Sequence, residues 1–284
     1  MASSLAVHHC SSVSRCQRVP WRLNGLGFHP LLTTTSSVIR AQKRVHLSRT
    51  YCTAKPFVVA EDEKYGNKQV ISVTPRLYDY ILSNVREPEI LRELREETAN
   101  MRGSQMQVSP DQAQLLAMLV QLLGAKRCIE VGVYTGYSSL AIALVLPESG
   151  RLVACERDAK SLEIARKYYD KAGVSHKVIV KHGLAMDTLE SLLLNGEACS
   201  YDFAFVDAEK RMNQEYFELL LQLVRAGGVI VIDNVLWHGK VADPMVNDAK
   251  TLSIRNFNKN LMEDKRVSIS IVPIGDGMTI CHKR

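Results

Sequence analysis

The residues best suited to chemistry in this 284-residue chain are polar groups that end apolar runs. Asp207 follows the run 203–206, and Asp233-Asn234 follows the run 227–232. Each run is typical of a short buried strand, and open α/β sheets bind ligands outside the carboxyl ends of their strands. Carboxylate and amide oxygens favour Mg²⁺, Mn²⁺ or Ca²⁺ over zinc or copper. Asp also commonly ends strands and caps helices, so these residues alone leave the metal site open.

A second polar feature lies upstream, between Glu130 and Ser138. Its glycines, Gly132 and Gly136, are typical of the turn after the first strand of a nucleotide-binding sheet, but the three-glycine pattern of dinucleotide sites is missing. Glu130 precedes the turn, where an anion would repel a pyrophosphate and favour a sulfonium or ammonium cation. Glu156 ends the next run, where an acid can accept hydrogen bonds from ribose hydroxyls. These residues predict a ribose-bearing ligand with a positive head, and S-adenosylmethionine fits.

The segments that must position these residues alternate between strand and helix patterns. Apolar runs predict seven strands, at residues 128–131, 152–155, 178–180, 203–206, 229–232, 267–271 and 278–281. Helical patterns cover residues 75–84, 88–101, 111–123, 138–146, 159–172, 184–195, 214–225 and 250–262. Continuous rather than alternating apolar runs indicate an α/β fold with a mostly parallel sheet and helices on both faces. The short turn 273–277 predicts an antiparallel C-terminal strand pair.

The first 60 residues differ in composition from the rest. They hold eight Lys and Arg residues and no acid, because Glu61 is the first acidic residue. This Ser-rich, acid-poor segment is typical of an organellar transit peptide that is removed after import, and a basic tail that stays attached is the alternative. The opening Met1-Ala2-Ser3-Ser4 and the many hydroxyls favour the chloroplast over the mitochondrion. Residues 61–284 are predicted to form a single domain.

Charge balance argues against nucleic acid as a partner. The whole chain has 36 basic and 30 acidic residues, but residues 61–284 alone carry 28 bases and 30 acids. The basic character therefore belongs to the leader. No apolar stretch of the sequence is long enough to predict a membrane span.

Five blocks of sequence resemble the cation-dependent O-methyltransferases, which include the plant caffeoyl-CoA and the catechol-type enzymes. The blocks are residues 86–89, 129–138, 205–210, 233–237 and 273–280. The resemblance runs from about Val73 to the C-terminus and implies a Rossmann-like class I methyltransferase fold. It also implies transfer of a methyl group from S-adenosylmethionine to a vicinal dihydroxy aromatic, of catechol, hydroxycinnamoyl ester or flavonoid type.

The resemblance assigns roles residue by residue. Asp207, Asp233 and Asn234 match the family's metal ligands, and Lys210 matches its candidate base, for which an exposed surface lysine is the alternative. The matches to cofactor-binding positions are Val108, Glu130, Gly132, Val133, Ser138, Glu156, Ala185 and Glu209. His238 stands where the caffeoyl-CoA enzymes usually have Asn, and the segment 239–252 is shorter than theirs. That segment is implied to set acceptor choice, so the natural acceptor stays open.

Two other functions are compatible with parts of the sequence. A nucleotide-dependent oxidoreductase on a dinucleotide-binding fold would need the missing glycine and would be repelled by Glu130. A non-catalytic relative that only binds cofactor would not need to keep Asp207, Lys210, Asp233 and Asn234 together. The resemblance further implies a homodimer, for which the helices at 75–84 and 88–101 offer apolar faces: Leu77, Tyr78, Ile81, Leu82, Ile90 and Leu94. These faces could equally cover the sheet.

Overall fold

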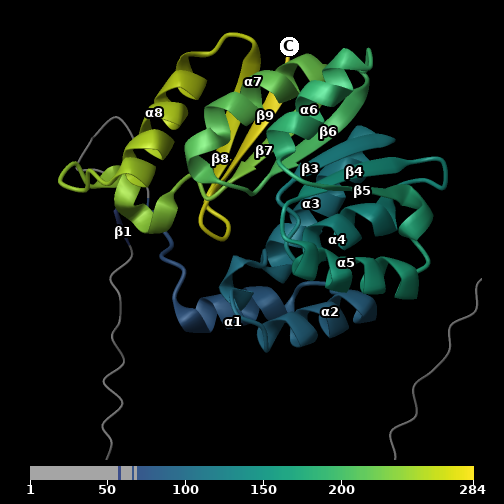
Figure 1. The fold of residues 1–284 in the computed structure, drawn as a ribbon. Coiled ribbons are helices and arrows are strands. Elements are labelled where there is room, and N and C mark those ends of the chain that lie inside the picture. Colours follow the sequence, from purple (N-terminus) through teal and green to yellow (C-terminus); the bar gives the residue numbers. More distant parts are fainter. Residues whose placement is uncertain (1–56, 59–65, 67–68) are drawn as a thin grey trace, which may run out of the picture. The chain divides into compact units, whose positions relative to one another are not determined.

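Seven strands form one sheet in the order β5-β4-β3-β6-β7-β9-β8 (Figure 1). The computed structural model describes residues 57–58, 66 and 69–284. The strands of this sheet are β3 (Arg127–Val131), β4 (Arg151–Glu156), β5 (Val178–His182), β6 (Tyr201–Val206), β7 (Val224–Asp233), β8 (Val267–Val272) and β9 (Met278–Lys283). β3 to β7 are parallel, and β9 lies antiparallel between β7 and β8. The predicted class I methyltransferase sheet is confirmed, with β9 as the single reversed strand.

Helices cover both faces of this sheet, as the continuous apolar strands predicted. On one face, α3 (Pro110–Leu123), α4 (Tyr137–Val145) and α5 (Ala159–Lys171) pack on the strands, with α1 (Pro75–Ser83) and α2 (Glu89–Ala99) outside them. The other face carries α6 (Ala185–Leu194), α7 (Asn213–Leu223) and α8 (Ala249–Glu263). Side chains alternate between the faces along each strand, so Cys128 joins the first core and Ile129 the second.

One boundary differs clearly from the sequence prediction. A helix was expected to run to Arg225, but α7 ends at Leu223 and β7 begins at Val224, which pairs with Tyr201. Helix periodicity cannot predict the end of α7, because a contact with a strand distant in sequence determines it. Lys283 Nζ, from β9, donates to the carbonyl oxygens of Leu221 (2.7 Å) and Val224 (2.8 Å) and so satisfies the end of α7.

The predicted leader lies almost wholly outside the described residues. Its last part is the exception, because Phe57–Val58 (β1) pairs antiparallel with Gln69–Val70 (β2). Strand pairing thus begins before residue 60. Cleavage of the leader stays a prediction. Residues 54–284 form one compact unit. In the part of the chain that the structure describes, no helix has the length and apolar character needed to cross a membrane.

We predict that a chain starting at Ala54 folds as the full-length protein does, because this compact unit begins there. Its midpoint of thermal unfolding should stay within about 2 °C of that of the full chain, because both described core clusters are retained in it. Circular dichroism melts of both proteins test this. Insoluble expression of the shortened chain would contradict it.

Candidate active site

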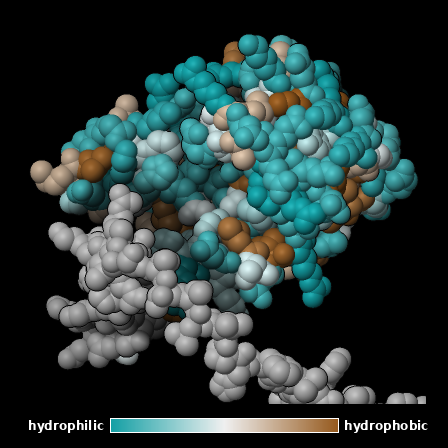
Figure 2. Space-filling model, turned by 90° about the horizontal axis from the view of Figure 1, so that it is seen from below, coloured by the Kyte–Doolittle hydropathy of each residue, from teal (hydrophilic) through white to brown (hydrophobic). Residues whose placement is uncertain are grey.

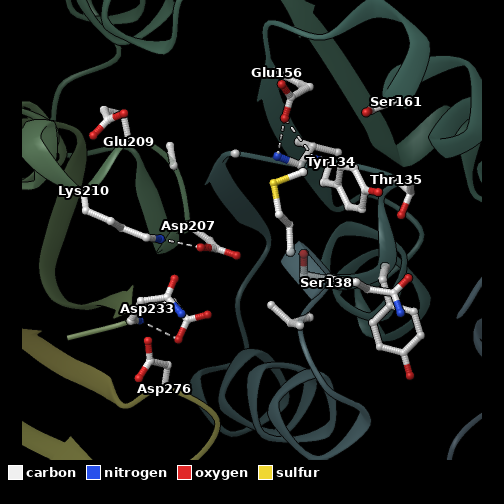
Figure 3. A pocket seen from close by; sticks show the side chains of 18 of the residues that line it. Tyr134, Thr135, Ser138, Glu156, Ser161, Asp207, Glu209, Lys210, Asp233 and Asp276 are labelled. Atoms are coloured by element: carbon white, nitrogen blue, oxygen red, sulfur yellow. Dashed lines mark hydrogen bonds and ion pairs between the residues drawn. The ribbon is translucent and has the colours of Figure 1, made fainter. Parts of the chain in front are cut away.

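A cavity of about 760 Å³ opens at the carboxyl ends of β3, β4, β6 and β7. It has two chemically different ends, which Figure 3 shows together. Glu156 and Tyr134 lie at one end. Asp207, Lys210 and Asp233 lie at the other, and Ser138 lies below Tyr134 in this view. The cavity is therefore large enough for two ligands side by side, at the position where open α/β sheets bind them.

The turn after β3 is part of the cavity wall and lies against Asp207. Gly132 has φ +90°, and a Cβ there would lie 2.2 Å from the carbonyl oxygen of Asp207. Only glycine allows both this backbone conformation and this close approach. The contact brings the turn that follows β3 against the chain that leaves β6. The turn predicted to bind the cofactor and the predicted metal ligand Asp207 therefore lie in the same cavity wall.

Glu156 fixes the shape of that turn. Its Oε2 accepts the backbone N–H groups of Val133 (3.0 Å) and Tyr134 (2.9 Å). Its Oε1 accepts those of Arg157 (2.8 Å) and Asp158 (2.9 Å). Four donors occupy the lone-pair directions of one carboxylate, so a ribose diol would have to displace or share some of them. The Glu156 side chain lies at the end of its strand, as the sequence predicted. Its role in holding the turn after β3 was not predicted.

Glu130 lies behind the cavity wall rather than on it. It is completely buried, and its two oxygens accept hydrogen bonds from the hydroxyls of Ser138 and Ser139 at the start of α4. Burial is the main reason why the pKa of Glu130 rises to about 8, and the charges of Asp207 and Glu156 add to the shift. The other predicted site residues line the cavity. A direct contact of Glu130 with a cofactor stays a prediction.

At the other end, two strand-ending carboxylates meet. Asp207 follows Val206, which pairs with Ile232 of the neighbouring strand, and Asp233 follows Ile232. Lys210 is buried, and its Nζ donates to Asp207 Oδ1 at 2.5 Å. Desolvation raises the pKa of Asp233 well above its usual range, and the charge of Asp207 raises it further. The site therefore concentrates negative charge in a buried place.

The chain that follows β7 is held in an unusual conformation beside this end. Asn234, Trp237 and His238 have φ values of +60°, +49° and +53°, a region that residues other than glycine seldom occupy. The turn after β8 holds the segment: Asp276 Oδ1 accepts the His238 N–H at 2.6 Å, and the Gly277 carbonyl accepts the N–H of Val235 at 3.0 Å. The fixed conformation brings Asn234 into the cavity wall next to Asp233.

Several lining residues were not predicted from the sequence. They include Gln112, Tyr134, Ser161, Trp237, Lys250 and Asp276. Gln112 lies three residues after Ser109 and forms a capping box with it. This pattern in the sequence indicates the start of a helix, but it does not predict that Gln112 lines the cavity. Lys250 Nζ lies 5.7 Å from the ring centre of Trp237, a contact between segments that spacing alone cannot reveal.

Comparison with known proteins identifies the family. The model of a family described as O-methyltransferase matches residues 82–284. The chain belongs to the O-methyltransferase family. It is 47% identical to tricin synthase 1 of Oryza sativa subsp. japonica, over 73% of this chain and 87% of that protein. It is 43% identical to caffeoyl-CoA O-methyltransferase 2 of Zea mays, over 77% of this chain and 86% of that one.

A solved structure supports the same placement of this O-methyltransferase. The O-methyltransferase TomG of Streptomyces achromogenes, solved in complex with S-adenosylmethionine, is 35% identical. The match has a TM-score of 0.65 and covers 72% of this chain and 94% of TomG. The resemblance found in the sequence blocks is therefore confirmed at the level of the family and the fold.

We predict that Gly132→Ala damages this O-methyltransferase much more than Gly173→Ala. Both glycines have positive φ, so each alanine is strained by about 1–2 kcal/mol. Only at Gly132 would the new Cβ collide with backbone, whereas Gly173 has no atom within 4 Å of that position. Titration calorimetry with S-adenosylhomocysteine should show affinity falling more than about tenfold for Gly132→Ala and staying near wild type for Gly173→Ala. Equal affinities of the two variants would contradict this role of the turn.

Proposed function

We propose that this O-methyltransferase transfers a methyl group from S-adenosylmethionine to one hydroxyl of a vicinal dihydroxy aromatic, with a divalent cation. The observation that carries the proposal is the juxtaposition in one cavity of a nucleoside-type turn and two strand-end carboxylates, the half-buried Asp207 and the buried Asp233. The tricin synthase and caffeoyl-CoA names of its relatives support an aromatic acceptor. The acceptor class proposed is a catechol, a hydroxycinnamoyl ester or a flavonoid.

The end of the cavity formed by Gly132, Val133, Ser138 and Glu156 would bind the cofactor. TomG, which shares this fold, was solved with S-adenosylmethionine. Glu156 would accept the ribose hydroxyls in place of some of the N–H groups that it now holds. Val108, Ala185 and Glu209 line the same cavity and complete the proposed cofactor contacts. Buried Glu130 would hold Ser138 and Ser139 in position behind them.

The donor set at the other end fits a hard divalent cation. Asp207, Asp233 and Asn234 supply carboxylate and amide oxygens, which suit Mg²⁺ first and Mn²⁺ or Ca²⁺ as alternatives. No group of three His, Cys, Asp or Glu side chains that could hold a metal occurs within residues 57–58, 66 and 69–284, so the amide of Asn234 is needed as the third ligand. Burial, and after it the charge of Asp207, raise the pKa of Asp233, and Lys210 offsets this only in part. A bound cation would stabilise the charged form of Asp233.

Lys210 is the proposed proton acceptor. A bound divalent ion would polarise a chelated phenol oxygen and make its proton easier to remove. Lys210 Nζ lies beside Asp207 and is buried, so it is protected from bulk water. The surrounding turns would hold the acceptor oxygen in line with the methyl group, which supplies much of the rate in such reactions.

The family assignment gives no support to the oxidoreductase alternative. The non-catalytic alternative is tested by activity. Purified protein should methylate catechols, hydroxycinnamoyl esters or flavonoids that carry two neighbouring hydroxyls. EDTA should abolish this activity and Mg²⁺ should restore it. Methylation of matched monophenols at the same rate, unaffected by EDTA, would overturn the proposal, and absence of all methylation would favour the non-catalytic reading.

We also propose a homodimer. α1 has no buried residue, although Leu77, Tyr78, Ile81 and Leu82 line one side of it, whereas Leu94 of α2 is completely buried in the core. Nearby apolar side chains are exposed: Tyr80, Met118 and Leu122. Figure 2 shows a mainly hydrophilic surface interrupted by separate apolar groups of this kind. A second copy of the chain could cover part of them, and the mass of the processed chain in sedimentation equilibrium tests this.

The proposed site of action is the chloroplast, with the mitochondrion as the alternative. The support is the acid-free, hydroxyl-rich composition of residues 1–60. A fusion of these residues to a fluorescent protein would report the destination directly.

Two variants separate the proposed roles of the metal end. Asp233→Ala should abolish catechol methylation, because one carboxylate and one amide hold a hydrated divalent ion poorly. Lys210→Ala should lower kcat by on the order of 10²–10⁴-fold, the usual contribution of a general base. A modest rise in pH, kept below the free phenol pKa of roughly 10, should recover activity in Lys210→Ala, where a bound cation would still lower the phenol pKa. The same rise should not recover activity in Asp233→Ala, where the cation is lost.

The control for both variants is binding of S-adenosylhomocysteine, which should change by no more than a few-fold because the cofactor end is intact. An Asp233→Ala enzyme that methylates a catechol in EDTA at the wild-type rate would refute the metal role.

A further inference from the structure

Gln112 lies in the first turn of α3 and joins three separate elements at the metal end of the cavity. Its side chain is 5% exposed. The amide contacts Ser109 before α3, Asp233 at the end of β7, and the backbone of Gly275 in the turn between β8 and β9. Helix capping accounts for the first contact only. The other two contacts call for a different explanation.

The orientation of the Gln112 amide is fixed by its hydrogen bonds. Oε1 accepts from the backbone N–H of Ser109 at 3.1 Å and from the Ser109 hydroxyl at 2.9 Å. With the oxygen so engaged, Nε2 must face Asp233, and it donates to Asp233 Oδ1 at 3.1 Å. The opposite orientation would place an amide oxygen against a carboxylate oxygen and an NH₂ group against an N–H group.

This hydrogen bond distinguishes the two oxygens of Asp233. Oδ1 accepts both from Gln112 and from the backbone N–H of Asn234 at 2.7 Å. Oδ2 accepts no hydrogen bond within the described residues, so it is the oxygen available to a cation. The amide is neutral. It therefore fixes the carboxylate without adding a positive charge that would compete with the ion, as a lysine or arginine in its place would.

We propose that Gln112 is a positioning residue for the metal site, which holds Asp233 so that one oxygen is presented to the divalent cation. The inference rests on the proposed function, since it presupposes a cation at Asp207, Asp233 and Asn234. Groups that orient metal ligands in this way contribute about 10–100-fold to metal affinity.

Gly275 supports this role from the opposite side. It has φ +54°, and a Cβ on it would lie 2.5–2.6 Å from the Cδ, Nε2 and Oε1 atoms of Gln112. The turn between β8 and β9 thus lies against the amide, and a Cβ at this position would fit only if the amide moved. Capping of α3 does not require this enclosure, whereas a fixed donor to Asp233 does.

The test is the Mn²⁺ affinity of the full-length protein, measured by electron paramagnetic resonance. Gln112→Leu should weaken Mn²⁺ binding by about 10–100-fold. The matched control is Gln114→Leu, two residues further along α3, where the side chain accepts the Arg86 N–H at 2.8 Å outside the cavity. That variant should bind Mn²⁺ within about threefold of wild type, and both should bind S-adenosylhomocysteine as wild type does. Thermal unfolding confirms that each variant is folded at the assay temperature.

A second pair of variants leaves Gln112 and Asp233 unchanged. Gly275→Ala should also weaken Mn²⁺ binding, because its Cβ displaces the amide. Gly124→Ala, at φ +60° with no atom within 4 Å of its Cβ position, should not. If wild-type protein binds no Mn²⁺, the proposed metal role itself fails. If wild type binds Mn²⁺ and Gln112→Leu binds it equally well, Gln112 only caps the helix and this inference is overturned.

Discussion

Val206 and Ile232 are paired in neighbouring parallel strands, and this register forces the carboxylates that follow them to the same edge of the sheet. Asp233 is buried and Asp207 is half-buried, and their like charges are unfavourable there unless other groups compensate them. Much of the surrounding structure provides that compensation. Lys210 pairs with Asp207, while the Asn234 N–H and the Gln112 amide hold Asp233. A divalent cation would neutralise the negative charge that remains on Asp207 and Asp233. The proposed chemistry depends on this remaining charge, because it is what would bind the cation.

The cofactor end depends on the same sheet edge. Gly132 allows the turn after β3 to approach the Asp207 carbonyl, so the two halves of the cavity are joined through backbone. Glu156 then holds the turn through the N–H groups of Val133 and Tyr134. Because backbone rather than flexible side chains joins the two ends, the distance between a bound cofactor and the metal end would be set by the fold. Such fixed placement is what methyl transfer between two bound partners requires.

Much of this arrangement could be predicted from the sequence. The strand ends at Asp207 and Asp233 follow from continuous apolar runs, because a buried parallel strand must be apolar on both faces. The turn at Gly132 follows from glycine spacing after a strand. These features are local, so short windows of sequence contain them. All of the site residues predicted from the sequence except Glu130 line the cavity.

The remaining features depend on contacts between distant segments. Gln112 lies 121 residues from Asp233, and nothing in its helix signals that contact. The end of α7 is determined by Lys283, which arrives from β9. Glu130 is completely buried because its side chain points to the α4 face of β3, where the hydroxyls of Ser138 and Ser139 donate hydrogen bonds to its carboxylate. Sequence periodicity predicts the face of the sheet on which a side chain lies, but not the residue that it contacts there.

The most direct test of the account is the position of the metal. Crystals grown with Mn²⁺ and S-adenosylhomocysteine would give an anomalous difference map at the manganese edge. The account predicts one strong peak at about 2 Å from oxygens of Asp207, Asp233 and Asn234, with the cofactor product at the Gly132 and Glu156 end of the same cavity. A fully occupied cofactor with no manganese peak between these three side chains would contradict it.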